Sequence, residues 1–305
     1  MSQLNNPYNI RRAMMISRFS SIFTYIVVGI MAFACLAPFL FVFNMSISSP
    51  ENVLARNVFL FPRGFTLAAY ERVINTTMIW RSYANTIFYV SSATILNCVF
   101  SVMGGYALSK NELPGRRLFS FLLLIPMFFT GGMIPTYVLI VKLGIYNSPL
   151  AIILPASVAV WHVILTRTFI KTIPKSICES AYIDGAGDIA ILFRIIVPLS
   201  KPIIAVIGLY TAVGVWNSWL PALLYLPDRE LQPIQLFLAR LLVLETTILN
   251  REGAIQDMRQ SMNFVSMMLQ LKYAAVIFCS LPIICAYPFL QRYFIKGVLL
   301  GSLKE

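Results

Sequence analysis

The chain has 305 residues, of which 58% are hydrophobic and 12% are charged, and its formal net charge is +12. A soluble domain carries about twice that charged fraction, so the composition argues against a soluble protein and favours one that lies in a membrane. The basic excess does not indicate a nucleic-acid partner, because no basic face with interleaved aromatic residues accompanies it.

Six long stretches of the sequence contain no Asp, Glu, Lys or Arg. A helix that crosses a bilayer needs roughly 20 mostly apolar residues, and within lipid its backbone amides must be bonded inside the segment. We therefore predict an all-α polytopic membrane protein, with one transmembrane domain over 1–305 and six transmembrane helices. Six such runs argue against the alternative of buried core helices in a large soluble protein. The predicted spans are about 20–45, 83–109, 118–141, 147–166, 202–226 and 273–291.

The first span follows three arginines, Arg11, Arg12 and Arg18, as the apolar part of a secretory signal peptide would. Its apolar run from Ile22 to Met45 is too long for a signal peptide, and no cleavage site with small residues closes it. We therefore interpret this run as a retained transmembrane helix.

The basic residues predict the orientation of the chain. With the N-terminus inside, 14 of the 24 Lys and Arg residues fall on the inner side and 10 on the outer side. The outer residues come mostly from two long loops, where the positive-inside rule has less force. The count favours cytoplasmic N- and C-termini in the plasma (inner) membrane.

The remaining connections predict further structure. Spans three and four are joined by a short segment around Gly144–Pro149, which favours an antiparallel hairpin. The external loop 227–272 contains an apolar run, Leu236–Ile248, that is interrupted by Arg240 and Glu245. This pattern predicts an amphipathic helix at or near the membrane surface instead of a seventh span. Prolines inside the spans should kink their helices; they are Pro38, Pro126, Pro135, Pro155, Pro282 and Pro288.

Residues for cofactor chemistry are scarce. The chain has one histidine, five cysteines with no CxxC pair, and no phosphate-binding GxxxxGK[ST] loop. We therefore expect no catalytic residue, no metal site and no cofactor in this chain. No span contains Asp or Glu, whereas ion-coupled transporters usually keep an ionisable group within the membrane. A self-sufficient channel or secondary carrier, and a membrane-embedded enzyme, remain as alternatives.

The inner loop 167–201 carries the most informative pattern. A helix that begins after Pro174 would place Ile177, Ala181 and Asp184 along one side, at i, i+4 and i+7. Most of that face is small and apolar, so it suits docking into a cleft on another protein.

Gly185 follows this helix and permits a sharp turn, because a residue without Cβ accepts positive φ. A second short helix is predicted from Asp188 to Arg194, with Asp188 near the helix N-terminus, where negative charge is favourable. Pro198 and Pro202 should end it before the fifth span. The predicted product is a helix-turn-helix knob at the inner membrane surface.

This loop resembles the E-A-A-x3-G-x9-I-x-L-P motif of the permease subunits of ABC importers. The chain matches it, at the family spacing, at Glu179, Ala181, Gly185, Ile195 and Pro198. Ser180 replaces the second-position alanine and Val197 replaces leucine. Further segments look like maltose-type carbohydrate permeases, in particular the oligo- and polysaccharide branch; they are Ser49–Tyr70, Gly105–Ser109, Phe128–Pro135, Trp216–Trp219 and Tyr287–Gly297.

The resemblance implies a type I ABC importer permease fold and a carbohydrate or oligosaccharide cargo. It implies four kinds of partner: the lipid bilayer, a second similar permease, two cytoplasmic ABC ATPase subunits that hold ATP and Mg, and an extracellular sugar-binding protein. In this family the loop docks into a groove of an ATPase and couples ATP hydrolysis to transport. The coupling residues carried over by position are Glu179, Ser180, Ala181, Asp184, Gly185, Ala186, Ile195 and Pro198.

Residues that could contact a sugar lie in the fourth and fifth spans. Sugars are commonly held by aromatic faces and by amides that bond hydroxyl groups. Tryptophan near a membrane surface is usually an anchor, and a polar side chain often bonds a neighbouring helix, so each candidate has a structural alternative. The candidates for the substrate pathway are Trp216, Asn217, Trp219, Tyr210 and His162.

Overall fold

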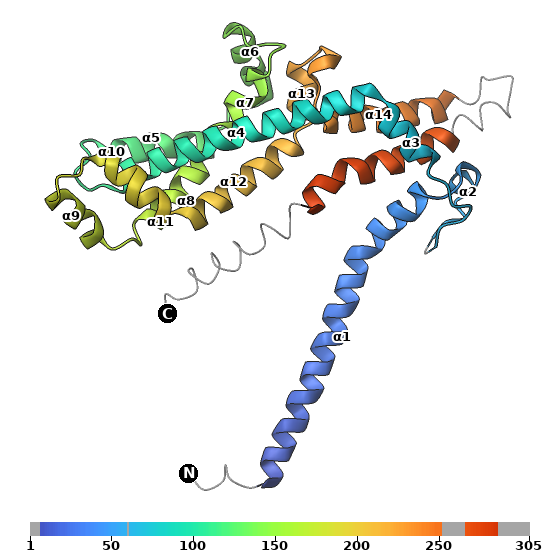
Figure 1. Ribbon diagram of the computed structural model, residues 1–305, viewed down its shortest axis with the longest axis horizontal. Helices are drawn as coiled ribbons and strands as arrows, with labels where there is room; N and C mark the ends of the chain where they lie inside the picture. The colour runs from blue at the N-terminus through green and yellow to red at the C-terminus, as the bar shows by residue number, and fades with distance from the viewer. Residues whose placement is uncertain (1–6, 60, 252–265, 286–305) are drawn as a thin grey trace. The chain divides into compact units, whose positions relative to one another are not determined.

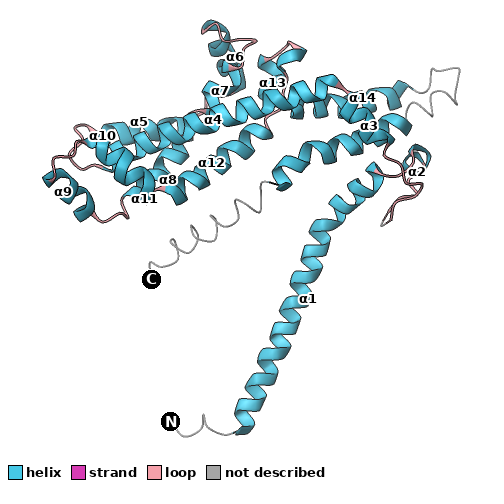
Figure 2. Cartoon of the chain, viewed as in Figure 1, coloured by secondary structure: helices cyan, strands magenta, loops and turns pink. Residues whose placement is uncertain are grey.

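The computed structural model describes residues 7–59, 61–251 and 266–285, and the regular structure in these ranges is helical throughout (Figure 2). The all-α prediction is therefore confirmed for the described residues. The chain divides into two compact units, Met1–Val73 with Glu245–Ile277 and Ile74–Leu244 with Phe278–Glu305 (Figure 1).

Four helical stretches in the described ranges are long and apolar enough to cross a membrane. They are Ser21–Ser46 within α1 (Pro7–Ser46), α4 (Thr77–Ser109), the stretch Leu150–Ile170 made of α7 (Leu150–Ala156) and α8 (Val160–Ile170), and Ser266–Cys285. Two further pairs of helices pass the same test but are sharply bent, so the number of crossings rises to six when each pair is one span.

The first bent pair replaces the single helix expected over 118–141. α5 (Arg116–Phe128) and α6 (Met133–Lys142) meet at 115°. Phe129 leaves the helix with an extended backbone, and Gly132 has φ of 85°, a value that a residue without Cβ adopts readily. The break therefore comes from the glycine-containing segment between the helices.

The second bent pair forms the start of the predicted fifth span. A helical stretch Asp188–Leu199 meets α12 (Lys201–Trp216) at 79°. The span expected over 202–226 is not one helix, because α12 ends at Trp216 and a separate α13 (Leu220–Tyr225) follows. In the last predicted span, the described helix already includes Ser266, before the expected start at 273, and residues 286–291 lie outside the described ranges.

α4 is the centre of the second unit and packs along α8 and α12 (Figure 1). Gly105 makes the first of these contacts possible. A Cβ built there would lie 2.9 Å from the backbone nitrogen of Arg167 and 2.9 Å from Cβ of Thr166. On α12, a Cβ at Gly208 would lie 3.3 Å from Sγ of Cys98. Small residues thus bring these helices together, as is common for helices in lipid.

Buried apolar side chains gather at each end of this packed group of helices. One cluster joins α4 to α7, α13 and the start of α14 (Ile234–Arg251); it contains Tyr89, Ala93, Ile152, Val215, Ala222, Tyr225 and Leu236. The other cluster joins α4 to the region of the predicted inner loop; it contains Val102, Tyr106, Ile170, Ile191, Leu192 and Ile196. This second cluster supports the candidate site.

The run expected to be an amphipathic surface helix is α14, and its first turn is buried. Ile234 and Leu236 are almost fully buried, and the Ile234 amide donates to Thr86 Oγ1 of α4 at 2.8 Å. The short 3₁₀ helix Arg229–Leu231 precedes it, and the Leu231 carbonyl accepts from the Tyr89 hydroxyl at 2.7 Å. The beginning of α14 is therefore part of the second unit's core.

The first unit contains the end of α1 and the loop that follows it, with α2 (Pro50–Leu54) and the start of α3 (Ala68–Asn75). The Ser46 hydroxyl bonds that of Tyr70 at 2.7 Å, and the Thr66 amide donates to the Ile47 carbonyl at 2.9 Å. The Gln270 side chain donates to the buried Ser48 carbonyl at 2.8 Å. These bonds hold the loop against the end of its helix.

Candidate functional site

α9 (Lys175–Ile183) begins after Pro174, as predicted, and its end is set by Gly185. The Ala186 amide donates to the Ala181 carbonyl at 2.9 Å, and the Gly185 amide donates to the Tyr182 carbonyl at 3.0 Å. This pair of bonds is the Schellman arrangement, which requires a left-handed residue after the helix. Gly185 has φ of 81°, so the predicted sharp turn is confirmed.

The same arrangement explains the small residues of the motif. Ala181 and Ala186, at the two ends of the longer Schellman bond, both pack against the buried cluster around Ile191 and Leu192. An apolar contact of this kind often accompanies a Schellman end. Ile195 packs against the cluster as well. These three predicted coupling residues are therefore directed, at least in part, toward the chain's own core.

The second helix of the loop is longer than predicted. α10 (Asp188–Ile191), a π-helical turn (Leu192–Ile196) and α11 (Val197–Leu199) follow one another directly, so Pro198 lies inside the helical stretch and does not end it. A π-turn interrupts the ordinary series of backbone hydrogen bonds in a helix. Proline has no N–H to donate, so it is tolerated directly after such a turn. The chain then bends at Ser200.

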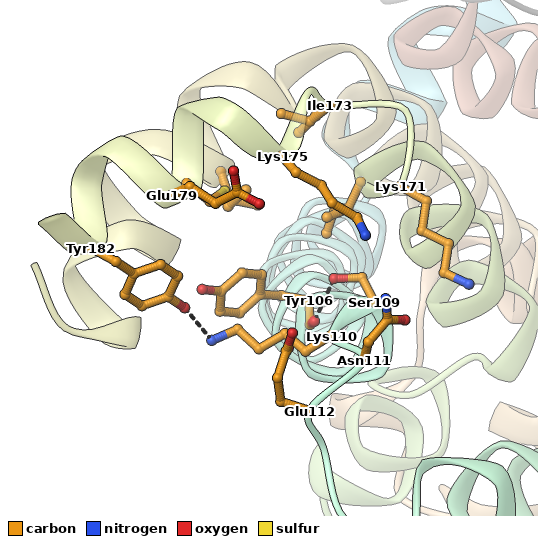
Figure 3. Close-up of a pocket in the computed structure, with 13 residues that line it drawn as sticks. Tyr106, Ser109, Lys110, Asn111, Glu112, Lys171, Ile173, Lys175, Glu179 and Tyr182 are labelled. Carbon is orange, nitrogen blue, oxygen red and sulfur yellow. Dashed lines mark hydrogen bonds between the residues drawn. The ribbon is translucent and has the colours of Figure 1, made fainter.

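A polar tether fastens this loop to the end of α4. Lys110 donates to the Tyr182 hydroxyl at 2.7 Å (Figure 3). Lys110 also forms an ion pair with Asp188, and the Tyr182 hydroxyl donates to Asp188. The Lys110 ammonium also lies 4.7 Å from the centre of the Tyr106 ring. The hydrogen bonds from Lys110 and Tyr182 hold the pKa of Asp188 below its usual value. The carboxylate is thus ionised at neutral pH.

The outer surface of the loop combines exposed apolar and acidic side chains. Ile183 and Ile189 are 87% and 75% exposed, on either side of the Gly185 turn. Glu179 and Asp184 are exposed beside them. Exposed isoleucines contribute nothing to the chain's own core, so this surface is suited to contact with another molecule. Of the other predicted coupling residues, Ser180, Gly185 and Pro198 are also exposed.

A cavity of about 420 Å³ lies between α9 and the ends of α4 and α8. The Lys175 and Glu179 side chains point into it from α9, and Tyr106 and Lys110 line it from the α4 side (Figure 3). The cavity separates part of the loop from the helices behind it. The contacts of Lys110 therefore connect α9 and α10 to the end of α4 beside this cavity.

A second cavity, of about 340 Å³, lies among α4, α7, α8, α12 and α13. His162 lines it, and its Nδ1 is 2.7 Å from Asn97 Oδ1 and 3.4 Å from Thr211 Oγ1. The Asn97 amide donates to the Ala156 carbonyl at 3.2 Å. Three polar side chains from three helices thus face one space in an otherwise apolar region. Within the described ranges, no three His, Cys, Asp or Glu residues gather in a metal-binding arrangement.

The structure does not bring all five predicted pathway residues into this cavity. His162 lines it, and Tyr210 stacks on the His162 ring with centres 6.2 Å apart. Trp216 is buried edge-to-face against Tyr83, and no acceptor among the described residues receives its indole N–H. Asn217 donates to the Val213 carbonyl at 2.9 Å in its own helix. Trp219 is exposed.

Both the loop and the His162 cavity include residues that were not predicted from the sequence. Asn97 and Thr211 lie in the middle of charge-free runs, and their polarity there was a signal, because polar residues within a span often mark a helix contact or a pathway. Lys110 gave no signal, since nothing in the sequence pairs it with residues more than seventy positions later.

Comparison with known proteins finds relatives that cover most of the chain. It is 35% identical to the polygalacturonan/rhamnogalacturonan transport system permease protein YtcP of Bacillus subtilis (strain 168), over 90% of this chain and 94% of that protein. It is 36% identical to the protein LplC of the same organism, over 88% of each. An arabinooligosaccharides transport system permease protein, AraQ of Halalkalibacterium halodurans, is 29% identical over 90% of this chain and 92% of its own length.

A solved structure matches as well. It is the crystal structure of a bacterial ABC transporter involved in the import of the acidic polysaccharide alginate. One of its chains is 33% identical and superposes with a TM-score of 0.81 over 91% of this chain and 97% of that chain. A search of protein-family models found no match.

The helical fold and the match to a solved importer define a multi-pass membrane transport subunit and not an enzyme. The chain belongs to the family of permease subunits of binding-protein-dependent sugar ABC importers. A member of this family functions with a partner permease, an ATPase and a binding protein. The family expected from the inner-loop motif is thereby confirmed.

Proposed function

We propose that the loop from α9 to α11 is the element through which two cytoplasmic ATPase subunits drive this permease and a second, similar one. Two features support this role. The loop carries an apolar, acid-flanked surface in Ile183 and Ile189 that the chain's own core does not use. The Schellman turn and the Lys110 tether give that surface a fixed position, so that a push on it reaches the helices behind.

The proposal divides the predicted coupling residues by role. Glu179, Ser180 and Asp184 would face the ATPase, together with the two exposed isoleucines. Ala181, Gly185, Ala186 and Ile195 would shape and seat the turn, and Pro198 would act in the helical stretch that leads to α12. This division follows from their exposure and packing.

The loop would lie in the cytoplasm, with the N- and C-termini on the same side of the plasma membrane. The distribution of Lys and Arg supports this orientation. On the other side, an extracellular binding protein would deliver the cargo. ATP and Mg would belong to the ATPase subunits, and this chain would hold no cofactor.

The cargo would be a carbohydrate, and the relatives named for the transport of polygalacturonan/rhamnogalacturonan and of arabinooligosaccharides support an oligosaccharide. The cavity with Asn97, His162 and Thr211 offers the hydrogen-bonding groups that hydroxyls need. Trp216 holds a buried N–H with no acceptor among the described residues, so it is a second candidate. Tyr210 stacks on the His162 ring, and Asn217 and Trp219 stay in the proposed pathway on the sequence alone.

Two nearby glycines provide the sharpest test of the coupling role. Neither Gly185 nor Gly187 has any heavy atom within 4 Å of a built Cβ, so alanine fits at both. They differ in backbone: Gly185 has φ of 81°, whereas Gly187 has φ of −76°, which alanine adopts freely. Gly185→Ala should therefore distort the turn by strain of roughly 1 kcal/mol or more, while Gly187→Ala is the matched control.

The measurement is ATP-dependent uptake into vesicles that contain the assembled importer. We expect Gly185→Ala to insert normally and to lose most of its uptake, and Gly187→Ala to keep it. Equal uptake by both variants would reject the docking role. Uptake by the wild-type chain that persists without ATPase subunits would favour a self-sufficient carrier instead.

A further inference from the structure

Three basic residues gather where α5 begins and α8 ends. Arg116 is the first residue of α5, Arg167 lies in the last turn of α8, and Lys171 is the first residue after α8. The ion pairs in the described part of the chain are Arg81 with Glu230 and Lys110 with Asp188, so none of these three cations has a carboxylate partner there. This basic group is not part of the coupling motif.

The group is electrostatically unsatisfied. The positive charge of Arg167 lowers the pKa of Lys171, with further contributions from desolvation of the ammonium and from the charge of Arg116. The Arg167 Nε is buried and no hydrogen-bond acceptor among the described residues faces it. Its Nη1 makes a long bond of 3.4 Å to the Ser120 hydroxyl of α5. A bound anion would relieve the repulsion among these cations.

A cavity of about 500 Å³ adjoins these cations, lined by Ile164, Arg167, Thr168, Lys171 and Thr172. The two threonine hydroxyls already donate to backbone carbonyls, at 2.9 Å and 2.7 Å. The donors left for a ligand are therefore the guanidinium and the ammonium. Ile164, one turn earlier on α8, gives the cavity an apolar side.

We propose that Arg167 and Lys171, with Arg116 beside them, bind the phosphate group of an anionic phospholipid at this end of α8. The position favours a lipid over a soluble phosphate. The span Leu150–Ile170 ends here, so the cations lie at the depth of the headgroups, with apolar side chains of the span on the acyl side. Arginine suits phosphate because its planar donors match the phosphate oxygens, and basic pockets between transmembrane helices bind such headgroups.

The test measures lipid that stays with the importer. The assembled importer, containing the full chain, is extracted from membranes of phosphatidylcholine with a minor fraction of phosphatidylglycerol, and the bound lipids are quantified by mass spectrometry. A basic residue near the membrane surface contributes about fivefold to anionic lipid binding. Lys171→Gln should therefore reduce phosphatidylglycerol enrichment about fivefold, and Arg167→Gln with Lys171→Gln on the order of 25-fold.

Lys142→Gln is the matched control, because this exposed lysine ends α6 and is not part of the basic group. Its enrichment should equal that of the wild-type chain. Lys171 is also exposed, so its single variant tests the proposal even if the double variant fails to assemble.

Two outcomes would overturn the proposal. One is equal phosphatidylglycerol enrichment in Lys171→Gln, Lys142→Gln and the wild-type chain. The other is release of the lipid by inorganic phosphate at modest concentration, which would assign the cations to a soluble anion. If the first outcome came with loss of ATPase copurification in Lys171→Gln, the cations would be assigned to a protein contact. The lipid measurement does not depend on transport. A negative result would therefore reject the lipid site and leave the coupling proposal unaffected.

Discussion

The contact between α4 and α8 at Gly105 predicts how much a single added methyl group should lower the stability of the protein. A Cβ at this position would lie 2.9 Å from the Arg167 backbone nitrogen, as well as from two carbons of Thr166. Backbone cannot rotate away as a side chain can, so the helices must separate. Overpacking of this kind costs about 1–3 kcal/mol. A contact with backbone places this cost at the upper end of the range, and alanine favours a helix over glycine by about 1 kcal/mol, so Gly105→Ala should lose about 2 kcal/mol.

The neighbouring Gly104 provides the control. A Cβ there would lie 3.2 Å from a methyl group of Val163, a side-chain contact that relaxes with a small shift. Both substitutions change helix propensity equally and lie in the same helix. Gly104→Ala should therefore be neutral within about 1 kcal/mol, because the propensity gain offsets the contact.

The assay is the apparent melting temperature of the purified importer with each variant. Gly105→Ala should melt a few degrees below the wild-type chain, and Gly104→Ala close to it, at roughly 2–4 °C per kcal/mol. If Gly104→Ala proved the less stable of the two, or if Gly105→Ala melted with the wild-type chain, the helix contact described here would be refuted.

Four further perturbations address the two candidate sites. Lys110→Met should lower uptake while changing stability by less than about 1 kcal/mol, since the pair it breaks is partly exposed; near-normal uptake would exclude a coupling role for the tether. The pKa of Asp188 is lowered, so the stabilising effect of this carboxylate is complete at neutral pH and is lost as pH falls through that pKa. The melting temperatures of the wild-type and Asp188→Asn importers should therefore differ above that pH range and converge below it. Ile183→Ser should leave melting unchanged and reduce copurification of the ATPase, and a full yield of ATPase would remove Ile183 from the interface. Asn97→Ala leaves His162 without its partner, so it should cost about 0.5–2 kcal/mol and slow uptake; melting and uptake that both match the wild-type chain would count against the cavity.

The sequence predicted features that depend on short stretches of chain. A long charge-free run indicates a helix that lies in lipid. The start of α9 after Pro174 also follows from the neighbouring residues alone. The left-handed turn at Gly185 is local as well, because glycine is the residue that adopts it without strain. The family motif assigned this turn to the loop 167–201, where the structure has it.

Helix ends within the membrane were harder to predict. The chain between α5 and α6 contains no charged residue, so the charge-free run continues through the break at Gly132. The same holds where α12 ends at Trp216 and α13 begins. Composition measures whether a segment tolerates lipid, whereas a bend of this kind depends on backbone geometry and on the helices packed against it.

Long-range pairing was beyond sequence reasoning. The contact of Lys110 with Tyr182 and Asp188 joins two loops that neither spacing nor composition connects. The inward packing of Ala181 follows from its place in the Schellman turn, which only the tertiary arrangement identifies as resting on a core. A family motif marks residues that matter together and does not say which of them face the partner.

That distinction changes how the coupling motif works in physical terms. If Ala181 and Gly185 mainly shape the turn, the partner contact rests on side chains the motif leaves variable, such as Ile183 and Ile189. Different permeases could then keep one turn geometry and present different surfaces to their own ATPases. Motion of that surface would pass to α4 through Lys110 and to α12 through the bend at Ser200. Both helices line the cavity that contains His162, so under this proposal a rigid turn would connect movement of the ATPase to the pathway.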